Sequence, residues 1–122
     1  MFMKIYTGID IIEIEKFTYV LEKNNNIITK IFTANELVHF NNINKKYEQF
    51  AGKFACKEAL IKMFSSYLNI NYKLSDFEIL KLASGKPYVN ILNTKIKKYE
   101  TNIDISISHS DNTAIAIANL LI

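Results

Sequence analysis

Charged side chains are scattered through the apolar segment FAGKFACKEALIKMF, residues 50–64. Wound as a helix at about 100° per residue, this segment places Lys53 and Lys57 inside or at the edge of its apolar arc, with Glu58 just beside it. Surface helices normally keep their charges on one face, and carboxylates are rarely buried unless they are paired or bind a metal. Glu58 is therefore either half of a structural ion pair, with Lys57 or Lys62, or a ligand.

A second candidate carboxylate, Asp10, follows Gly8 near the end of the first alternating segment. Glycine lets another backbone or a ligand approach closely. The position of Asp10 fits either a helix N-cap or a ligand that points into a cleft. Two carboxylates from separate elements, with phosphate-binding lysines nearby, suit a Mg²⁺ ion that keeps several waters and also binds a substrate phosphate.

Two turns further along the chain carry groups that could bind an anion. The turn SGKP, residues 84–87, offers exposed amides and an ammonium, although a hairpin loop of this composition needs no function. His109 ends an alternating strand, where a lone histidine is more often simply exposed.

Cys56 lies among alanines and is interpreted as a small buried hydrophobe. No second His or Cys stands at metal-ligand spacing, so we do not expect zinc.

The composition bounds the class of protein. With 122 residues, 49% of them hydrophobic and 22% charged, the chain is expected to form one domain over residues 1–122 with a sizeable core. The net charge of +3 is far below that of a dedicated nucleic-acid binder. All 15 basic residues are lysines, so any anion site must use ammoniums and backbone amides. The single cysteine fits the cytoplasm, and no apolar run reaches the roughly 18 residues of a membrane span.

The elements that must position these residues follow from periodicity and turn signals. We expect an α+β domain with an N-terminal strand, three helices and an antiparallel β-meander. Thr33 and Glu36 form a capping box that opens the second helix and needs no other role. The expected strands are residues 5–11, 77–82, 88–92 and the two arms of a hairpin within 103–121; the expected helices are residues 12 to about 24, 34–42 and 47–67, with a helical turn or two in 93–100.

Taken in order, GIDIIEIEKF, FTANELVHF, FAGKFACKEALIKMF, SGKPYVNI and ISISHSDNTAIAIA resemble the holo-acyl-carrier-protein synthases, which are short, single-domain 4′-phosphopantetheinyl transferases. The resemblance runs from about Tyr6 to Ala118. It implies the fold of that family and the transfer of 4′-phosphopantetheine from coenzyme A to a serine of apo acyl carrier protein. Adenosine 3′,5′-bisphosphate is released, and the reaction supports fatty acid biosynthesis.

The same resemblance implies roles for single residues. Asp10 and Glu58 would hold Mg²⁺ against the diphosphate of coenzyme A, with Lys62 nearby as a third catalytic group. The proton acceptor stays open between Lys62, if it is buried, Glu58 and a metal-bound water. The coenzyme A site would be lined by Lys53, Lys57, Lys62, Gly85, Lys86, Pro87 and His109.

The family is a homotrimer with each site between neighbouring subunits, so the turn and His109 would face a different chain from the metal carboxylates. The final strand AIAIANLLI, apolar on both faces, fits self-association. The family usually carries Arg where this chain has Lys16, a position linked to docking of the carrier protein, and a second Arg where it has Lys53. Lysine supplies charge at these positions but not a bidentate fork.

A different class of function is a small basic binding module for RNA or an acidic protein, without catalysis. Its support is the lysines at positions 45, 46, 95, 97 and 98, which could equally form a solvated surface. This alternative has no use for Asp10 or Glu58, and it predicts exposed aromatic residues among the basic groups.

Overall fold

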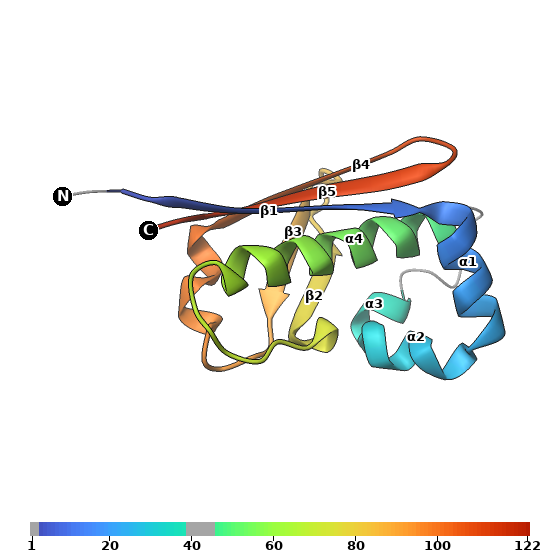
Figure 1. Cartoon of the computed structure of the whole chain (residues 1–122), viewed down its shortest axis with the longest axis horizontal. Helices are drawn as coiled ribbons and strands as arrows, with labels where there is room; N and C mark the ends of the chain where they lie inside the picture. Colours follow the sequence, from blue (N-terminus) through green and yellow to red (C-terminus); the bar gives the residue numbers. More distant parts are fainter. Residues whose placement is uncertain (1–2, 39–45) are drawn as a thin grey trace.

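The computed structural model describes residues 3–38 and 46–122 of the chain (Figure 1). The α+β class is confirmed, because helices and antiparallel strands pack in one unit. The strands are β1 (Ile5–Glu13), β2 (Phe77–Lys81), β3 (Pro87–Ile91), β4 (Ile103–His109) and β5 (Thr113–Leu121). The α-helices are α1 (Ile14–Lys23), α2 (Asn25–Ile31), α3 (Ala34–Val38) and α4 (Lys46–Ser65), with short 3₁₀ turns η1 (Leu74–Asp76) and η2 (Lys97–Asn102).

The larger sheet is three-stranded, and the last strand lies in its middle. Its order is β1-β5-β4, and both pairings are antiparallel. The helix α4 runs along one face of this sheet, and the α1–α3 helices gather at one end of the molecule (Figure 1). Alternation in β1 turns Tyr6, Gly8, Asp10 and Ile12 toward α4 and leaves the isoleucines between them exposed.

Small residues let β1 lie directly on α4. A Cβ placed on Gly8 would lie 1.8 Å from the Ala59 carbonyl oxygen and 2.7 Å from the Met63 nitrogen, so only glycine fits there. Ala55 and Ala59 of α4 are fully buried, as are Ala116 and Ala118 of β5 to within one per cent. The small flank of α4 therefore packs against the chain's own sheet.

The predicted β-meander divides into two sheets. β2 and β3 form a separate two-stranded hairpin, in which Ile79 pairs with Val89 and Lys81 pairs with Pro87. The turn between them contains Gly85 at φ +91°, a backbone conformation that favours glycine. Apolar side chains of this hairpin, of α4 and of the larger sheet make up one core, which includes Leu60, Phe64, Phe77, Ile79, Val89, Ile91, Ile105 and Leu120.

The N-terminal elements differ from the sequence-based prediction. β1 runs on to Glu13, and the helical region continues past the asparagine run, because residue 25 begins the further helix α2. The first helix buries Ile14, Phe17 and Leu21 as predicted, whereas Val20 is exposed. The second predicted helix, residues 34–42, begins at Ala34 as α3, and its residues 39–42 lie outside the described part of the chain.

Candidate active site

Asp10, Glu58 and Lys62 come together where β1 crosses α4. The Lys62 ammonium donates to Asp10 Oδ1 at 2.9 Å and to the Ile9 carbonyl oxygen at 3.0 Å. Asp10 reaches this position because strand alternation puts it on the α4 face, two residues after Gly8. Glu58 and Lys62 are one helical turn apart on α4, so both side chains point to the same side of the helix.

Electrostatics connect the two carboxylates. Burial raises the pKa of Glu58, the negative charge of Asp10 raises it further, and Lys62 acts in the opposite direction. A carboxylate whose ionisation is disfavoured by a neighbouring negative charge belongs to a site that a cation stabilises. The N-cap of α1 is Glu13, so the alternative of Asp10 as a helix cap is wrong.

Both lysines considered as ion-pair partners of Glu58 pair with other carboxylates. Lys62 pairs with Asp10, while Lys57 pairs with Glu36 on the other side of α4. The role of Lys62 as proton acceptor required a buried side chain. The Lys62 side chain is 54% exposed, so this condition is not met.

A separate pocket of about 150 Å³ lies between α4 and the β2–β3 hairpin. Its described lining brings together Lys53, Gly85, Pro87 and His109, four residues that the sequence assigned to one ligand. Gly52, Ile79 and Ile107 supply its apolar surface, and Glu48, Gln49 and Lys81 complete it. Asp10, Glu58 and Lys62 are not among these lining residues.

Charge in this pocket is mostly positive. Burial lowers the pKa of Lys53 to about 8; the Glu36 carboxylate acts in the opposite direction, and Lys81 adds to the lowering. His109 Nδ1 lies 3.6 Å from the Glu48 carboxylate. Lysines 53 and 81, the imidazole of His109 and the unhindered backbone at Gly85 together suit an anionic ligand.

Lys86, predicted for the coenzyme A site, and Lys16, predicted for docking of the carrier protein, are not among the described lining residues of the pocket. Lys86 Nζ pairs with Asp104 Oδ1 at 2.9 Å, with both side chains largely exposed. Lys16 is exposed on α1 and lies 3.5 Å from Glu13. Lys16 therefore remains available to a macromolecular partner, because an exposed pair of this kind contributes little stability.

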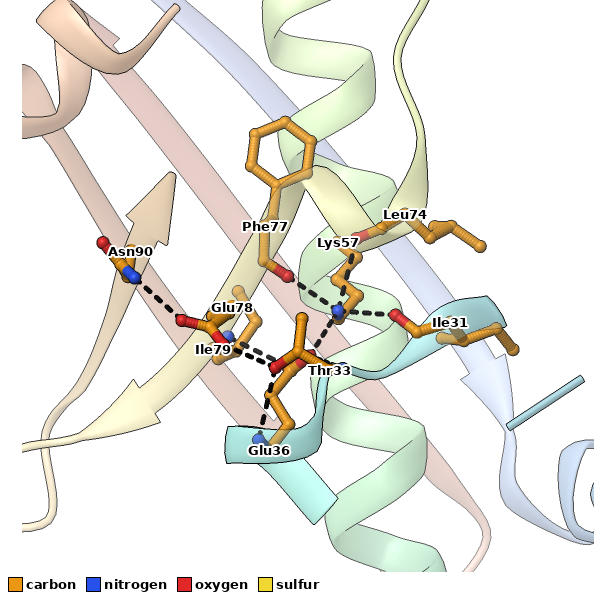
Figure 2. A network of polar contacts seen from close by, with 9 residues as sticks. All are labelled: Ile31, Thr33, Glu36, Lys57, Leu74, Phe77, Glu78, Ile79 and Asn90. Atoms are coloured by element: carbon orange, nitrogen blue, oxygen red, sulfur yellow. Dashed lines mark hydrogen bonds and ion pairs between the residues drawn. The ribbon is translucent and has the colours of Figure 1, made fainter. Parts of the chain in front are cut away.

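The prediction that Lys57 lines the coenzyme A site does not fit its surroundings. Figure 2 shows its ammonium enclosed by Glu36 and by three backbone carbonyls, those of Ile31, Leu74 and Phe77. The Lys57 side chain is fully buried. An ammonium has three protons, and all of them have acceptors here, so none is left for a phosphate.

The capping-box pattern did not predict that Glu36 is fully buried and paired. The predicted capping box forms, since Thr33 N–H donates to Glu36 Oε1 at 3.0 Å and Glu36 N–H donates to the Thr33 hydroxyl oxygen at 3.3 Å. The same carboxylate, fully buried, also holds Lys57 at 2.6 Å. The sequence feature that indicates this contact is Lys57, because a charged residue on the apolar arc of α4 requires a buried partner.

Three further observations bear on chemistry. Cys56 is fully buried, and burial raises the pKa of its thiol to about 12, as expected for an inert core cysteine. Within residues 3–38 and 46–122, no group of three or more His, Cys, Asp or Glu side chains is arranged to hold a metal ion. No helix in these ranges has the length and hydropathy needed to cross a bilayer.

Comparisons with known proteins agree on one family. A model of the 4′-phosphopantetheinyl transferase superfamily matches residues 6–118. The chain is 39% identical to the holo-[acyl-carrier-protein] synthase of Clostridium tetani, over 89% of each chain. It is 42% identical to that of Alkaliphilus oremlandii, over 91% of this chain and 93% of the relative.

Solved structures give the same result for the fold. The holo-(acyl-carrier-protein) synthase of Bacillus anthracis, in complex with coenzyme A (3′,5′-ADP), superposes with a TM-score of 0.80 at 30% identity, covering 98% of both chains. The holo-ACP synthase of Plasmodium yoelii gives a TM-score of 0.79 at 29% identity, covering 99% of this chain and 98% of that one.

Proposed function

Since the chain belongs to the 4′-phosphopantetheinyl transferase superfamily, we propose that it acts as a holo-[acyl-carrier-protein] synthase. It transfers 4′-phosphopantetheine from coenzyme A to a serine hydroxyl of apo acyl carrier protein and releases adenosine 3′,5′-bisphosphate. The observation that carries this function is the meeting of Asp10, Glu58 and Lys62 at one place, in a chain that matches these synthases over most of its length.

Asp10 and Glu58 are the residues that would hold Mg²⁺. Their hard carboxylate oxygens fit this ion, which takes one or two carboxylates, several waters and substrate phosphate rather than a full protein cage. The raised pKa of Glu58, caused by burial and by Asp10, indicates negative charge that a cation would relieve. An ion held there would supply charge neutralisation for the diphosphate of coenzyme A during transfer.

The chain's own groups then act on the two substrates. Lys62, exposed beside Asp10, supplies an ammonium for the diphosphate oxygens. The serine oxygen of the carrier attacks the phosphorus of the pantetheine phosphate, and the bond to the adenosine-side phosphate oxygen breaks. Glu58 would accept the serine proton, because Lys62 is paired with Asp10 and exposed.

The pocket between α4 and the β2–β3 hairpin would take the nucleotide half of coenzyme A. Lys53 supplies an ammonium and His109 an imidazole N–H for phosphate, and Gly85 and Pro87 supply a backbone surface without bulky side chains. Lys86, which points toward Asp104, would act only from the rim of this pocket.

Self-association as a homotrimer has support in the outer face of the larger sheet. Ile9 and Ile117 are directly paired across β1 and β5, and both are exposed on this face. The exposed apolar residues there are Ile5, Ile9, Ile11, Ile115, Ile117 and Leu121. An apolar sheet face of this size is typical of an interface, and a site shared between subunits would bring the pocket of one chain to the carboxylates of another.

Lys16 would serve as a docking charge for the acidic carrier protein, and we place the reaction in the cytoplasm, in support of fatty acid biosynthesis. The alternative of a binding module for RNA or an acidic protein has less support, because two of its lysines are engaged within the chain and Lys45 lies outside the described residues. Lys97 pairs with Glu100 and Asn90, and the Lys98 ammonium lies over the Tyr99 ring, so both are engaged locally.

The decisive experiment is incubation of the protein with coenzyme A, Mg²⁺ and several apo acyl carrier proteins, followed by intact-mass spectrometry. We expect a phosphopantetheine adduct on one serine of the carrier, abolished by chelation of the metal. Unmodified carriers throughout, with a well-folded protein, would refute the proposed activity.

A further inference from the structure

We propose that the buried Glu36–Lys57 ion pair fixes the distance between α4 and the β2–β3 hairpin, and thereby sets the affinity of the pocket between them for coenzyme A. Glu36 and Lys57 are then positioning residues, which touch no substrate. The identity of the ligand rests on the proposed function, whereas the role of the ion pair in shaping the pocket rests on contacts within the chain.

The Lys57 ammonium connects one residue of α4 to three other segments. It donates to the Ile31 carbonyl at the end of α2 at 2.7 Å, to the Leu74 carbonyl of η1 at 3.2 Å and to the Phe77 carbonyl of β2 at 2.7 Å. Together with Glu36 of α3, at 2.6 Å, these acceptors surround the nitrogen (Figure 2). Because hydrogen bonds are directional and short, the contact with Phe77 fixes α4 relative to β2, and the other three acceptors fix α4 relative to α2, α3 and η1.

Glu36 carries this constraint into the wall of the pocket. Its Oε2 receives the backbone N–H of Ile79 at 2.9 Å, and Ile79 lines the pocket. On the opposite wall, Lys53 lies one helical turn before Lys57 on α4. The ion pair therefore contacts one wall of the pocket through the Glu36–Ile79 hydrogen bond. It lies one helical turn from Lys53 in the opposite wall.

A second set of contacts extends the constraint to β3. The Thr33 hydroxyl donates to Glu78 Oε2 at 2.6 Å, and the Asn90 amide donates to Glu78 Oε1 at 2.8 Å. Figure 2 shows these side chains in a continuous series from α3 through β2 to β3. The hairpin thus receives its orientation from the polar network as well as from the apolar core, and its turn carries Gly85 and Pro87 of the pocket.

Stability alone does not explain a buried ion pair at this place. A buried pair can often be replaced by packed apolar residues without loss of stability, whereas removal of one partner leaves a buried charge and is strongly destabilising. An apolar pair fills the same volume but makes no directional contacts with Ile79 N or with the three carbonyls. The Glu36 carboxylate also favours the charged form of Lys53, because its negative charge opposes the effect of burial, which lowers the Lys53 pKa.

The test compares the double variant Glu36→Leu/Lys57→Met with the parent protein. We expect this variant to fold with a lowered melting temperature, because Ile79 N–H and the three carbonyls lose their side-chain partners. Calorimetric Kd values for coenzyme A and for adenosine 3′,5′-bisphosphate should rise about 10-fold or more, because small displacements of positioning groups are costly. The kcat at saturating coenzyme A should stay within about 3-fold of the parent, since Asp10, Glu58 and Lys62 are untouched. The control variant Lys97→Gln removes another ion pair but keeps the Glu100 contact with Ile91 N, and it should leave both Kd values unchanged.

A folded Glu36→Leu/Lys57→Met protein with parental Kd values would overturn the inference. If the double variant does not fold, Glu36→Gln/Lys57→Gln decides, because it removes both charges, leaves neither one unpaired and keeps polar side chains of similar size. A Kd for adenosine 3′,5′-bisphosphate raised about 3-fold or more supports the inference, and an unchanged Kd overturns it. Failure of the parent to modify any carrier would refute the proposed function, yet the binding measurements would still test the ion pair.

Discussion

The Lys62 ammonium bridges two elements of the fold, since it donates to the Asp10 carboxylate at 2.9 Å and to the Ile9 carbonyl at 3.0 Å. Lys62 and Asp10 are 52 positions apart in the sequence. Their contact exists because Gly8 allows β1 to lie against Ala59 of α4, so that the next inward-facing residue of the strand meets the side of α4 that carries Glu58 and Lys62.

Removal of either candidate metal ligand should abolish transfer. Asp10→Asn and Glu58→Gln each keep the size of the side chain but remove a carboxylate. We expect kcat/KM to fall about 100-fold or more, because charge stabilisation at a transferring phosphoryl group supplies several kcal/mol. The melting temperature should change little, since the Asp10–Lys62 pair is partly exposed. Glu22→Gln, at an exposed position of α1, is the control, and activity near the parental level in both test variants would contradict the assignment.

The pH dependence of coenzyme A binding should report Lys53. Burial lowers its pKa to about 8, so its ammonium is present below this pH and is lost above it. Coenzyme A affinity should therefore fall about 10-fold between about pH 7 and pH 9, since one charge contact is lost. Lys53→Arg keeps its charge throughout this range and should flatten the profile of Kd against pH. An unaltered profile in Lys53→Arg would assign the titration to another group.

Two glycines should respond differently to the same added methyl group. Gly8→Ala puts a Cβ 1.8 Å from the Ala59 carbonyl oxygen, and we expect a loss of about 3 kcal/mol or more in the free energy of unfolding. Gly85→Ala meets no atom within 4 Å but has a φ of +91°, so its cost should be about 1 kcal/mol. Urea denaturation compares the two, and equal losses would argue against the close contact of β1 and α4.

Lys16 should affect the carrier protein but not coenzyme A. Charge reversal in Lys16→Glu is expected to raise KM for the acidic carrier about 10-fold at low salt and less at high salt, because exposed charges are screened. The KM for coenzyme A should stay the same. Lys95→Glu, at another exposed position, is the matched control. Equal effects of the two variants would indicate a loss of overall positive charge instead of a docking contact.

The outer face of the larger sheet should control assembly. Ile9→Asp and Ile117→Asp each put a carboxylate into the middle of the exposed apolar face. We expect sedimentation equilibrium to give a trimer for the parent and a monomer for either variant, since a buried unpaired charge is costly at an interface. Val38→Asp changes an exposed apolar residue of α3 and should leave the trimer intact. A monomeric parent would refute the trimer itself.

Periodicity and turn signals were sufficient for most of the fold. Alternation predicted β2, β3, β4 and β5 to within a residue or two, and the length of α4 was predicted to within two residues at each end. The asparagine run was misinterpreted, because asparagine disfavours helix interiors but is acceptable where the next helix starts. The β-meander divided into two sheets because β1, from the other end of the chain, pairs with β5.

Residue types alone determined which groups of this protein could do chemistry: two carboxylates, a set of lysines, a glycine turn and one histidine. Only the tertiary structure decided the partner of each lysine. Lys53, Lys57 and Lys62 all lie on α4, yet one lines a pocket, one is enclosed by Glu36 and three carbonyls, and one meets Asp10. The spacing of residues on a helix gives the direction of each side chain, whereas the acceptor that it meets belongs to another element, placed by packing across the core.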